Sequence, residues 1–364
     1  MFRRLLPVVS LLVFGASCAR SNAAGNYIVR PLSPGGSVEM AWRITDSRQV
    51  LAARSVFEPD GTSSPVAGRE PWTNDINNVG DVVGSIAKAG WLRDERVAVR
   101  WTQGSLPIEL APLVLGGVHF STADAVNDVG WIAGRASDDY GMEHLVRWTP
   151  MGQIEDLFGD LLVSVYHRPS AINNSGIIVG ERYSYGDTGS QITQPFYWDG
   201  DFHVLPLFPE QGNVWTNDVN GSGLMVGGGY FNGLTERAFA WQTNGQFREL
   251  SLPAGYDPAA TLSSASAVND DGIIGGWVGS PESRESRACY WTPDNVAHLL
   301  PSLGGTEGDF LSGMNNLGWF VGNSHGQAVV WEPVPEPSSL LGILTGLLLT
   351  FLYFRAAFRP EAMG

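Results

Sequence analysis

The stretch Val126-Asn127-Asp128-Val129-Gly130-Trp131-Ile132-Ala133-Gly134 contains the pattern that decides the fold. An apolar residue precedes Asn127, two variable residues separate it from Gly130, and a short apolar run leads to Gly134. Asn and Gly both tolerate positive φ, so Asn-x-x-Gly predicts a tight turn between two antiparallel strands. Trp148 then ends a further strand-like segment.

This pattern occurs six times along the chain, and its Asn residues are separated by 50, 46, 47, 49 and 46 residues. A fixed period of this length indicates stacked supersecondary units. Each unit reads as four short strands, and four antiparallel strands per repeat are typical of propeller blades. The repeated residues are Asn77, Asn127, Asn173, Asn220, Asn269 and Asn315, followed in turn by Trp101, Trp148, Trp198, Trp241, Trp291 and Trp331.

Small side chains predict which strand of each unit lies innermost. Ala125, Ala171, Ala267 and Gly313 each stand two residues before a motif Asn. The blades of a propeller converge at its centre, where only small side chains fit, so we expect the strand before each Asn to be the inner one. We expect the repeated Trp residues to fill the space between blades.

The two ends of the repeat predict the number of blades. Ile44-Thr45-Asp46-Ser47-Arg48 is a degenerate copy of the motif and supplies a seventh unit. The last unit stops at Trp331 without a fourth strand, while residues 27–32 resemble a fourth strand without a unit. We therefore predict an all-β, seven-bladed propeller closed by its N-terminal strand, since closure removes exposed strand edges. The first unit lies only 32 residues before the second, so six blades and an open solenoid remain alternatives.

Residues 1–23 have the features of a secretory signal peptide. Arg3 and Arg4 precede a short apolar segment, and small residues follow it. Cys18 lies in a poor copy of a lipoprotein motif, so lipidation of this cysteine is a further alternative. The repeat domain is expected to span residues 24–333.

The C-terminal residues 334–364 form a three-part tail. Pro335-Glu336-Pro337 precedes an apolar segment, for which we predict a membrane helix over residues 338–354, and Arg355 follows it. This tail resembles the PEP-CTERM sorting signal. The resemblance implies processing by the transpeptidase exosortase, transient insertion in the inner membrane, and delivery to the cell surface or extracellular matrix of an exopolysaccharide-producing cell. A plain C-terminal membrane anchor is the alternative.

The repeat itself resembles the HAF repeat of extracellular proteins over nearly all of residues 27–331. The Asn, Gly and Trp elements match that repeat, whereas the His-Ala-Phe triplet for which it is named does not, and only His144 stands at its first position. The resemblance implies secretion and a β architecture, and it implies no reaction.

Composition and charge narrow the classes of function. The chain has 45 Gly and 13 Trp, and only 16% of its residues are charged, a mix that excludes a disordered chain or a coiled coil. Removing the five basic and two acidic residues of the two ends takes the net charge from −15 to −18. Such an acidic body argues against nucleic acid and anionic membrane surfaces as partners.

The segments between the second and third strands vary in length, and such variation on one face of a repeat protein marks a binding face. Aromatic side chains in these segments are suited to stacking on sugar rings. We therefore expect a polysaccharide or another envelope component as ligand. The candidate ligand-binding residues are Trp91, Tyr140, Tyr183, Tyr185, Tyr230, Phe231 and Trp277.

No nucleophile elbow, Walker loop or zinc-protease motif occurs in the sequence, and the histidines are scattered. We therefore predict no catalytic residue, metal or cofactor. Cys289 is expected to be a packed side chain, and Asn269-Asp270-Asp271-Gly272 a turn rather than a calcium loop. A non-enzymatic surface protein is the leading interpretation. A glycan hydrolase or lyase and a purely structural matrix protein are the alternatives.

Overall fold

The computed structural model describes residues 27–33, 40–88, 95–102, 105–114, 120–157, 165–185, 191–207, 211–231, 235–280, 285–305 and 307–334. In these ranges the chain forms 28 strands and no helix, so none of the described residues belongs to a helix able to cross a membrane. The expected signal peptide, the Pro335-Glu336-Pro337 motif and the expected membrane helix at 338–354 lie outside the described residues.

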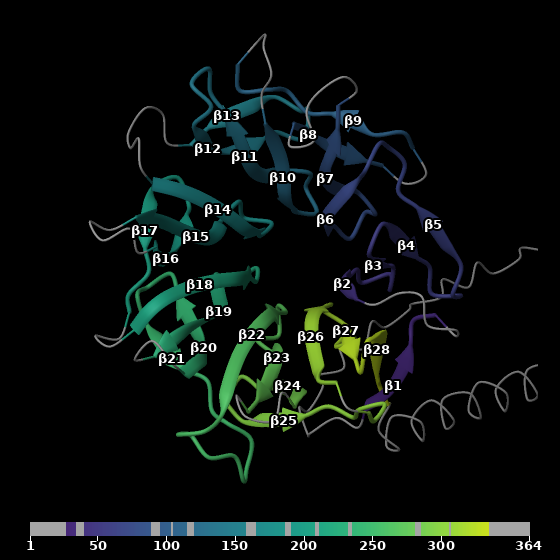
Figure 1. The fold of residues 1–364 in the computed structure, drawn as a ribbon, viewed down its shortest axis with the longest axis vertical. Coiled ribbons are helices and arrows are strands. Elements are labelled where there is room, and N and C mark those ends of the chain that lie inside the picture. The colour runs from purple at the N-terminus through teal and green to yellow at the C-terminus, as the bar shows by residue number, and fades with distance from the viewer. Residues whose placement is uncertain are drawn as a thin grey trace, which may run out of the picture.

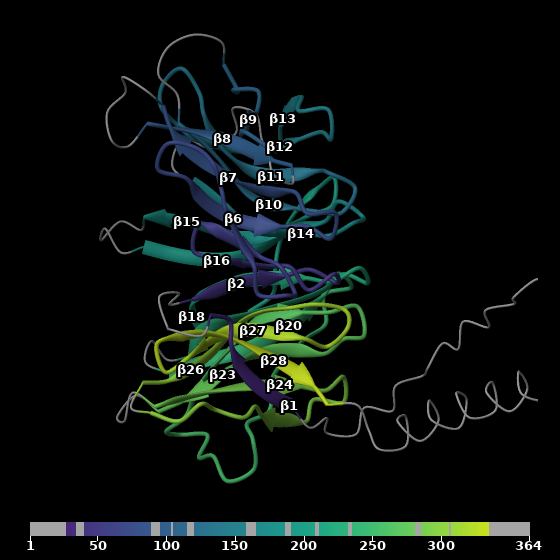
Figure 2. The same cartoon turned by 90° about the vertical axis from the view of Figure 1, so that its right-hand side faces the viewer.

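The strands form seven four-stranded antiparallel sheets, arranged as blades around a central axis (Figure 1). Blades 1 to 3 consist of β2 (Ala41–Ile44), β3 (Val50–Ala52), β4 (Ser55–Phe57) and β5 (Ser63–Pro65); β6 (Trp72–Ile76), β7 (Val82–Ala87), β8 (Arg96–Trp101) and β9 (Ile108–Glu109); and β10 (Ser121–Val126), β11 (Ile132–Ser137), β12 (Glu143–Trp148) and β13 (Ile154–Asp156). Blades 4 and 5 consist of β14 (Val165–Ile172), β15 (Ile178–Tyr185), β16 (Gln191–Trp198) and β17 (Phe202–Val204); and β18 (Gln211–Val219), β19 (Leu224–Phe231), β20 (Thr235–Gln242) and β21 (Phe247–Glu249). Blades 6 and 7 consist of β22 (Leu262–Val268), β23 (Ile274–Gly279), β24 (Ser286–Trp291) and β25 (Ala297–Leu299); and β26 (Asp309–Met314), β27 (Phe320–Ser324), β28 (Gln327–Pro333) and β1 (Tyr27–Pro31). The strand before each motif Asn lies nearest the axis, as predicted, and the ring is a disc when seen from the side (Figure 2).

The N-terminal strand closes the ring. Strand β1 is hydrogen-bonded to β28 in antiparallel register, with Tyr27 opposite Pro333 and Val29 opposite Trp331. Blade 7 is therefore assembled from both ends of the repeat domain, and the degenerate first unit forms a complete blade of its own. The predicted seven-bladed, N-terminally closed propeller is confirmed, and the six-bladed and open alternatives are excluded.

The first Gly of the motif is required by backbone conformation. Gly80, Gly130 and Gly176 have φ of 86°, 87° and 85°, in the left-handed region that residues with a Cβ rarely adopt. Blade 1 has Arg48 at this position with φ of 69°, so the degenerate unit keeps the turn at the expense of strain.

The second Gly is required by a β-bulge. Every inner strand shifts register two residues before its last residue, as between Ala123 and Ala125 in β10. The bulge pushes a backbone carbonyl toward the neighbouring strand, where a Cβ on Gly134 would lie 2.1 Å from the oxygen of Thr122. The five other complete motifs show the same approach, at 1.9–2.1 Å, so no larger residue fits there.

The repeated Trp residues pack between blades, as expected. Trp148 and Trp291 are fully buried, and the indole N–H of each donates to a carbonyl in the segment that leads from the preceding blade, that of Ala111 at 2.8 Å and Ser251 at 2.6 Å. Trp101, Trp241 and Trp331 make the same bond. Trp198 differs, because it is only half-buried and lies beneath the guanidinium of Arg147, 4.7 Å from the ring centroid.

Candidate functional site

The two faces of the disc have different origins. One face, called here the turn face, carries the Asn-x-x-Gly turns and the hairpins between the third and fourth strands of each blade. The opposite face, called here the loop face, carries the segments between the second and third strands and the links between blades. The inner strands of the seven blades converge on the axis of the ring, and the space between them is called here the channel.

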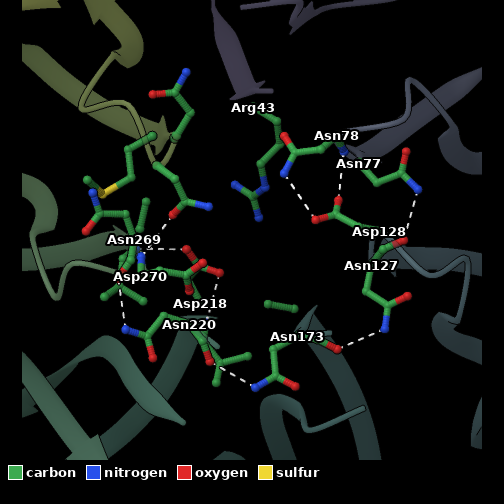
Figure 3. Close-up of a pocket in the computed structure, with 18 of the residues that line it drawn as sticks. Arg43, Asn77, Asn78, Asn127, Asp128, Asn173, Asp218, Asn220, Asn269 and Asp270 are labelled. Carbon is green, nitrogen blue, oxygen red and sulfur yellow. Dashed lines mark hydrogen bonds between the residues drawn. The ribbon is translucent and has the colours of Figure 1, made fainter. Parts of the chain in front are cut away.

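The channel has a cavity of about 180 Å³ that opens toward the turn face (Figure 3). The motif Asn side chains line it, and all of them except Asn269 have two roles. Asn173 accepts a hydrogen bond from the N–H of Ile177 on its Oδ1, and its Nδ2 donates to the carbonyl of Asn220 in the next blade at 2.9 Å. An Asn amide combines the acceptor and the donor that these two bonds need, whereas an Asp would lack the donor.

The same inter-blade bond recurs between other blades. Asn77 donates to Asn127, Asn127 to Asn173, and Asn220 to Asn269, with N–O distances of 2.8–2.9 Å. The series is interrupted at Asn269, whose buried Nδ2 has no hydrogen-bond partner in the described part of the chain. Residues that follow the motif Asn add a second series of inter-blade bonds, in which the N–H of Asn78 donates to Asp128 at 2.8 Å and that of Gly221 to Asp270 at 2.8 Å. Most polar groups of this opening thus hold blades together.

Three charged side chains lie deeper in the channel. The guanidinium Nε of Arg43 lies 3.2 Å from Asp75 Oδ1, and the carboxylates of Asp75 and Asp218 each accept an N–H from the following blade, at 2.9 and 2.8 Å. Burial raises the pKa of Asp218 to about 6, with Arg43 opposing the shift, and burial likewise raises the pKa of Asp75. These carboxylates bridge blades 2 and 3 and blades 5 and 6, so their geometry supports a structural role.

The loop face holds most of the predicted ligand-binding residues. Tyr140 is 90% exposed in the turn between β11 and β12, and Tyr185 is 60% exposed at the end of β15. Tyr183 lies on β15, Tyr230 and Phe231 end β19, and Trp277 lies on β23. Trp91 lies outside the described residues. The residues are therefore distributed over blades 3 to 6 rather than gathered in one cleft.

Aromatic partners organise three of these residues into pairs, called here the aromatic arc. Tyr183 stacks on Tyr166 with ring centroids 5.1 Å apart in blade 4. Tyr230 meets Trp215 edge to face at 5.6 Å in blade 5. Trp277 of blade 6 meets Phe310 of blade 7 edge to face, also at 5.6 Å. The arc thus crosses four consecutive blades near the starts of their inner strands.

Sequence reasoning missed the inner-strand members of the arc. Trp215 and Phe310 each stand five residues before a motif Asn, and Trp72 occupies the same position in blade 2. Trp72 is 56% exposed, and the guanidinium of Arg96 lies 3.8 Å from its ring centroid. Aligning the repeats on this position is the signal by which these aromatic residues would have been found.

A buried ionic network adjoins the arc in blades 3 and 4. Arg135 lies between Asp124, at 3.0 Å, and Glu143, at 2.9 Å. Burial raises the pKa of Asp124 and of Glu181, although the charges of Arg135 and Arg168 act on both carboxyls in the opposite direction. The pKa of Tyr183 is raised by burial and by the charge of Glu143. The network places two carboxyl groups of raised pKa beside an aromatic pair.

The remaining chemical candidates have structural roles. Cys289 is fully buried and burial raises the pKa of its thiol well above the usual value, as expected for a packed side chain. Gly272 has φ of 77°, so Asn269-Asp270-Asp271-Gly272 forms the same tight turn as the other units. Within the described ranges, no three His, Cys, Asp or Glu side chains come together as metal ligands do.

No protein-family model matches the chain, and neither does any curated protein sequence. Solved structures share its architecture. Virginiamycin B lyase from Staphylococcus aureus is 12% identical, with 85% of this chain and 100% of that chain covered and a TM-score of 0.51. A puromycin hydrolase is 14% identical, with 82% of this chain and 49% of that chain covered and a TM-score of 0.50. At these identities the likeness shows the propeller fold alone.

Proposed function

We propose that this protein is a non-enzymatic, exported surface or matrix protein that binds polysaccharide with the loop face of its propeller. The aromatic arc is the observation that carries the proposal. Its rings are held by one another rather than buried in the core, and Tyr230 and Phe310 are 39% and 38% exposed. Rings that are pre-positioned and partly exposed are suited to stacking on the apolar faces of sugars.

The resemblance of residues 334–364 to a PEP-CTERM tail supports the location of this activity. Exosortase would process the tail, and the acidic propeller would remain at the cell surface or in the matrix. The net charge of the whole chain is −15, and this negative charge disfavours nucleic acid as a partner. A secreted polysaccharide is therefore the polymer that we expect it to meet.

The proposal is tested by affinity electrophoresis of the purified protein in gels that contain extracted exopolysaccharide. Tyr230→Ala and Phe310→Ala are expected to restore the mobility seen without polysaccharide, since loss of a stacking ring weakens binding by about tenfold. Met151→Ala is the matched control, because Met151 is 88% exposed in the hairpin between β12 and β13 on the turn face. Equal retardation of all variants would contradict the loop-face site and favour a purely structural matrix role.

A glycan hydrolase or lyase is the second candidate. The direction of the pKa shifts of Asp124 and Glu181 favours it, because burial raises the pKa of both carboxyls, as it does in carboxyl groups that act as general acids. Incubation with exopolysaccharide, followed by assays for new reducing ends and new double bonds, decides between the two. If the unmodified protein turns over the polysaccharide and Asp124→Asn and Glu181→Gln abolish this turnover, catalysis is established. If the unmodified protein shows no turnover, the hydrolase or lyase function is excluded.

A further inference from the structure

One residue in the wall of the channel differs in kind from its equivalents in the other blades. Every inner strand has a β-bulge, and the extra residue of each bulge is called here the bulge residue. It stands three residues before the motif Asn, or before Thr45 in blade 1. The bulge residues of blades 2 to 7 are Asn74, Asp124, Ser170, Asn217, Ser266 and Ser312. All of these are polar, whereas the bulge residue of blade 1 is Trp42.

The bulge residues lie along the channel. Each inner strand is the edge strand of its sheet, so its unpaired side faces the axis. Nδ2 of Asn74 donates to the carbonyl of Ala123 in the next blade at 2.8 Å, and Nδ2 of Asn217 donates to that of Ala265 at 2.7 Å. These side chains therefore extend from one inner strand to the next around the axis. Trp42 occupies the same position in blade 1, where its much larger ring protrudes from the wall.

The indole of Trp42 is available to a ligand. It is 42% exposed, although its neighbour Ala41 is completely buried. Ala41 belongs to the hydrophobic cluster between blades 7 and 1, and Trp42 does not. Among the described residues no aromatic ring or guanidinium stacks on Trp42, whereas the guanidinium of Arg96 lies 3.8 Å from the ring centroid of Trp72. An uncovered ring beside the axis is suited to stacking on the apolar face of a sugar.

Further aromatic side chains precede Trp42 on the way in from the loop face. Trp72, Trp215 and Phe310 stand five residues before the motif Asn of blades 2, 5 and 7, and Trp42 stands three residues before Thr45. The inner strands run from the loop face toward the turn face, and two residues of a strand span about 7 Å. Trp42 therefore lies about 7 Å deeper than these three rings. Two of the three belong to the aromatic arc, so the arc and Trp42 are successive levels of one opening.

Charged side chains close the channel beyond Trp42. The Nε of Arg43 lies 3.2 Å from Asp75 Oδ1 in blade 2, and its Nη1 donates to the carbonyl of Ser312 in blade 7 at 3.2 Å. The guanidinium points toward the middle of the ring (Figure 3), and its charge acts on Asp218 across the channel. A polymer that passed through would have to separate the ion pair and leave buried charges unpaired. For a chain that enters from the loop face, the channel ends at Arg43.

We propose that a polysaccharide enters this opening by a chain end and that its terminal sugar stacks on Trp42. An internal sugar would reach the ring only if the chain turned back within the channel, because Arg43 blocks the way through. The inference deepens the proposed polysaccharide function and rests on it. The aromatic arc supplies affinity for the chain, and Trp42 adds recognition of its end.

The test compares extracted exopolysaccharide with its own partial acid hydrolysate by isothermal titration calorimetry of the purified full chain. Hydrolysis keeps the kinds of sugar and raises the number of chain ends per gram, which a reducing-end assay counts. The amount of protein bound at saturation per gram of polysaccharide is expected to rise in proportion to the number of ends. A protein that recognises internal sugars would bind the same amount per gram, because the number of its sites follows the total chain length.

Variants test the role of Trp42 in this binding. With the hydrolysate, Trp42→Ala is expected to weaken binding about tenfold, and Trp42→Phe about threefold or less, because Phe keeps a stacking face. Trp319→Ala is the matched control, because Trp319 is also a partly buried tryptophan but follows the motif turn of blade 7 on the turn face. Its loss is expected to leave affinity within about twofold. Melting temperatures of the variants identify any loss of affinity that comes from unfolding.

The outcomes separate this inference from the function on which it rests. Equal binding per gram before and after hydrolysis would overturn the recognition of chain ends and leave the aromatic arc as a site for internal sugars. Binding that depends on chain ends but is unchanged in Trp42→Ala would overturn the role of Trp42. Failure of both preparations to bind would overturn the polysaccharide function itself.

Discussion

The side-chain amide of Asn315 donates to the backbone carbonyl of Thr45, 2.9 Å away in space and 270 residues away in sequence. It is the bond by which the last motif reaches the degenerate first one. Thr45 stands at the motif Asn position but has no side-chain amide to donate to the next blade. Its hydroxyl accepts the N–H of Gln49 at 3.0 Å, within the same turn. The series of Asn bonds is therefore interrupted at blade 1, as it is at Asn269 in blade 6, while the second series continues from blade 1 through the N–H of Asp46, which donates to Asn78 Oδ1 at 2.7 Å.

Replacing Asn315 by Ala is expected to lower stability by about 1–3 kcal/mol. The change leaves the N–H of Trp319 without its partner, and a buried unsatisfied group costs about that much. The carbonyl of Thr45 loses the bond from Asn315 but still accepts the N–H of Arg48 at 2.9 Å. Thermal unfolding measures the effect. Asn244→Ala in the exposed turn after β20 is the control, and an equal drop in melting temperature for the two variants would count against the inter-blade role.

The two glycines of one motif are expected to respond differently to Ala. Gly176 has φ of 85° with open space around it, so Gly176→Ala should cost only the backbone strain of about 1–2 kcal/mol. A Cβ on Gly180 would lie 2.1 Å from the carbonyl oxygen of Arg168, so Gly180→Ala should prevent blade 4 from forming. Soluble yield and melting temperature check this, and similar values for both would refute the bulge argument.

Asp218 is expected to make the protein less stable as the pH rises from about 4 to 6. Its folded pKa of about 6 lies above the unfolded value of 3.8, so its contribution is fully present below 3.8 and is lost as pH rises through 6. The change is on the order of 3 kcal/mol. Asp218→Ala introduces alanine, the residue that blades 3, 4 and 6 carry two positions before their motif Asn. The melting-temperature difference between variant and parent should be larger at pH 4 than at pH 7; a constant difference would be the contrary result.

His167 is expected to act in the opposite sense. It packs edge to face against Phe196 at 5.7 Å and Phe202 at 5.3 Å, and burial lowers its pKa to about 4. Since 4 lies below the unfolded value of 6.5, its contribution is present above pH 6.5 and is lost as the pH falls toward 4. His167→Gln should reduce the fall in melting temperature that occurs between pH 6.5 and pH 4. An unchanged acid limb would show that other groups govern it.

Glu336→Ala is expected to block processing of the C-terminal tail. If exosortase recognises Pro335-Glu336-Pro337, the variant should accumulate as an uncleaved, membrane-associated precursor of larger mass. Immunoblots of membrane and extracellular fractions measure this, with Ser338→Ala as the control. Identical fractionation of parent and variant would favour a plain anchor.

Most of the fold could be predicted from the sequence because each motif residue recurs for a local structural reason. The turn at Gly130, the small Ala125 and the interblade Trp148 each follow from one strand or one turn. The bulge that requires Gly134 could not be predicted in this way, because a bulge forms only where two strands are paired. The pair formed by Trp277 and Phe310 could not be predicted for a similar reason, because the two rings lie 33 residues apart in sequence and meet only where blades 6 and 7 adjoin.

The pairing of Tyr27 with Pro333 has a consequence for the orientation of the molecule if it is tethered. The two residues lie on the two outermost strands of blade 7, so the chain enters and leaves the disc at one point of its rim. That point lies on the side of the turn face, because β28 is the third strand of its blade and β1 the fourth. A tether attached after Pro333 would therefore leave the loop face as the face directed away from it, into the surrounding medium.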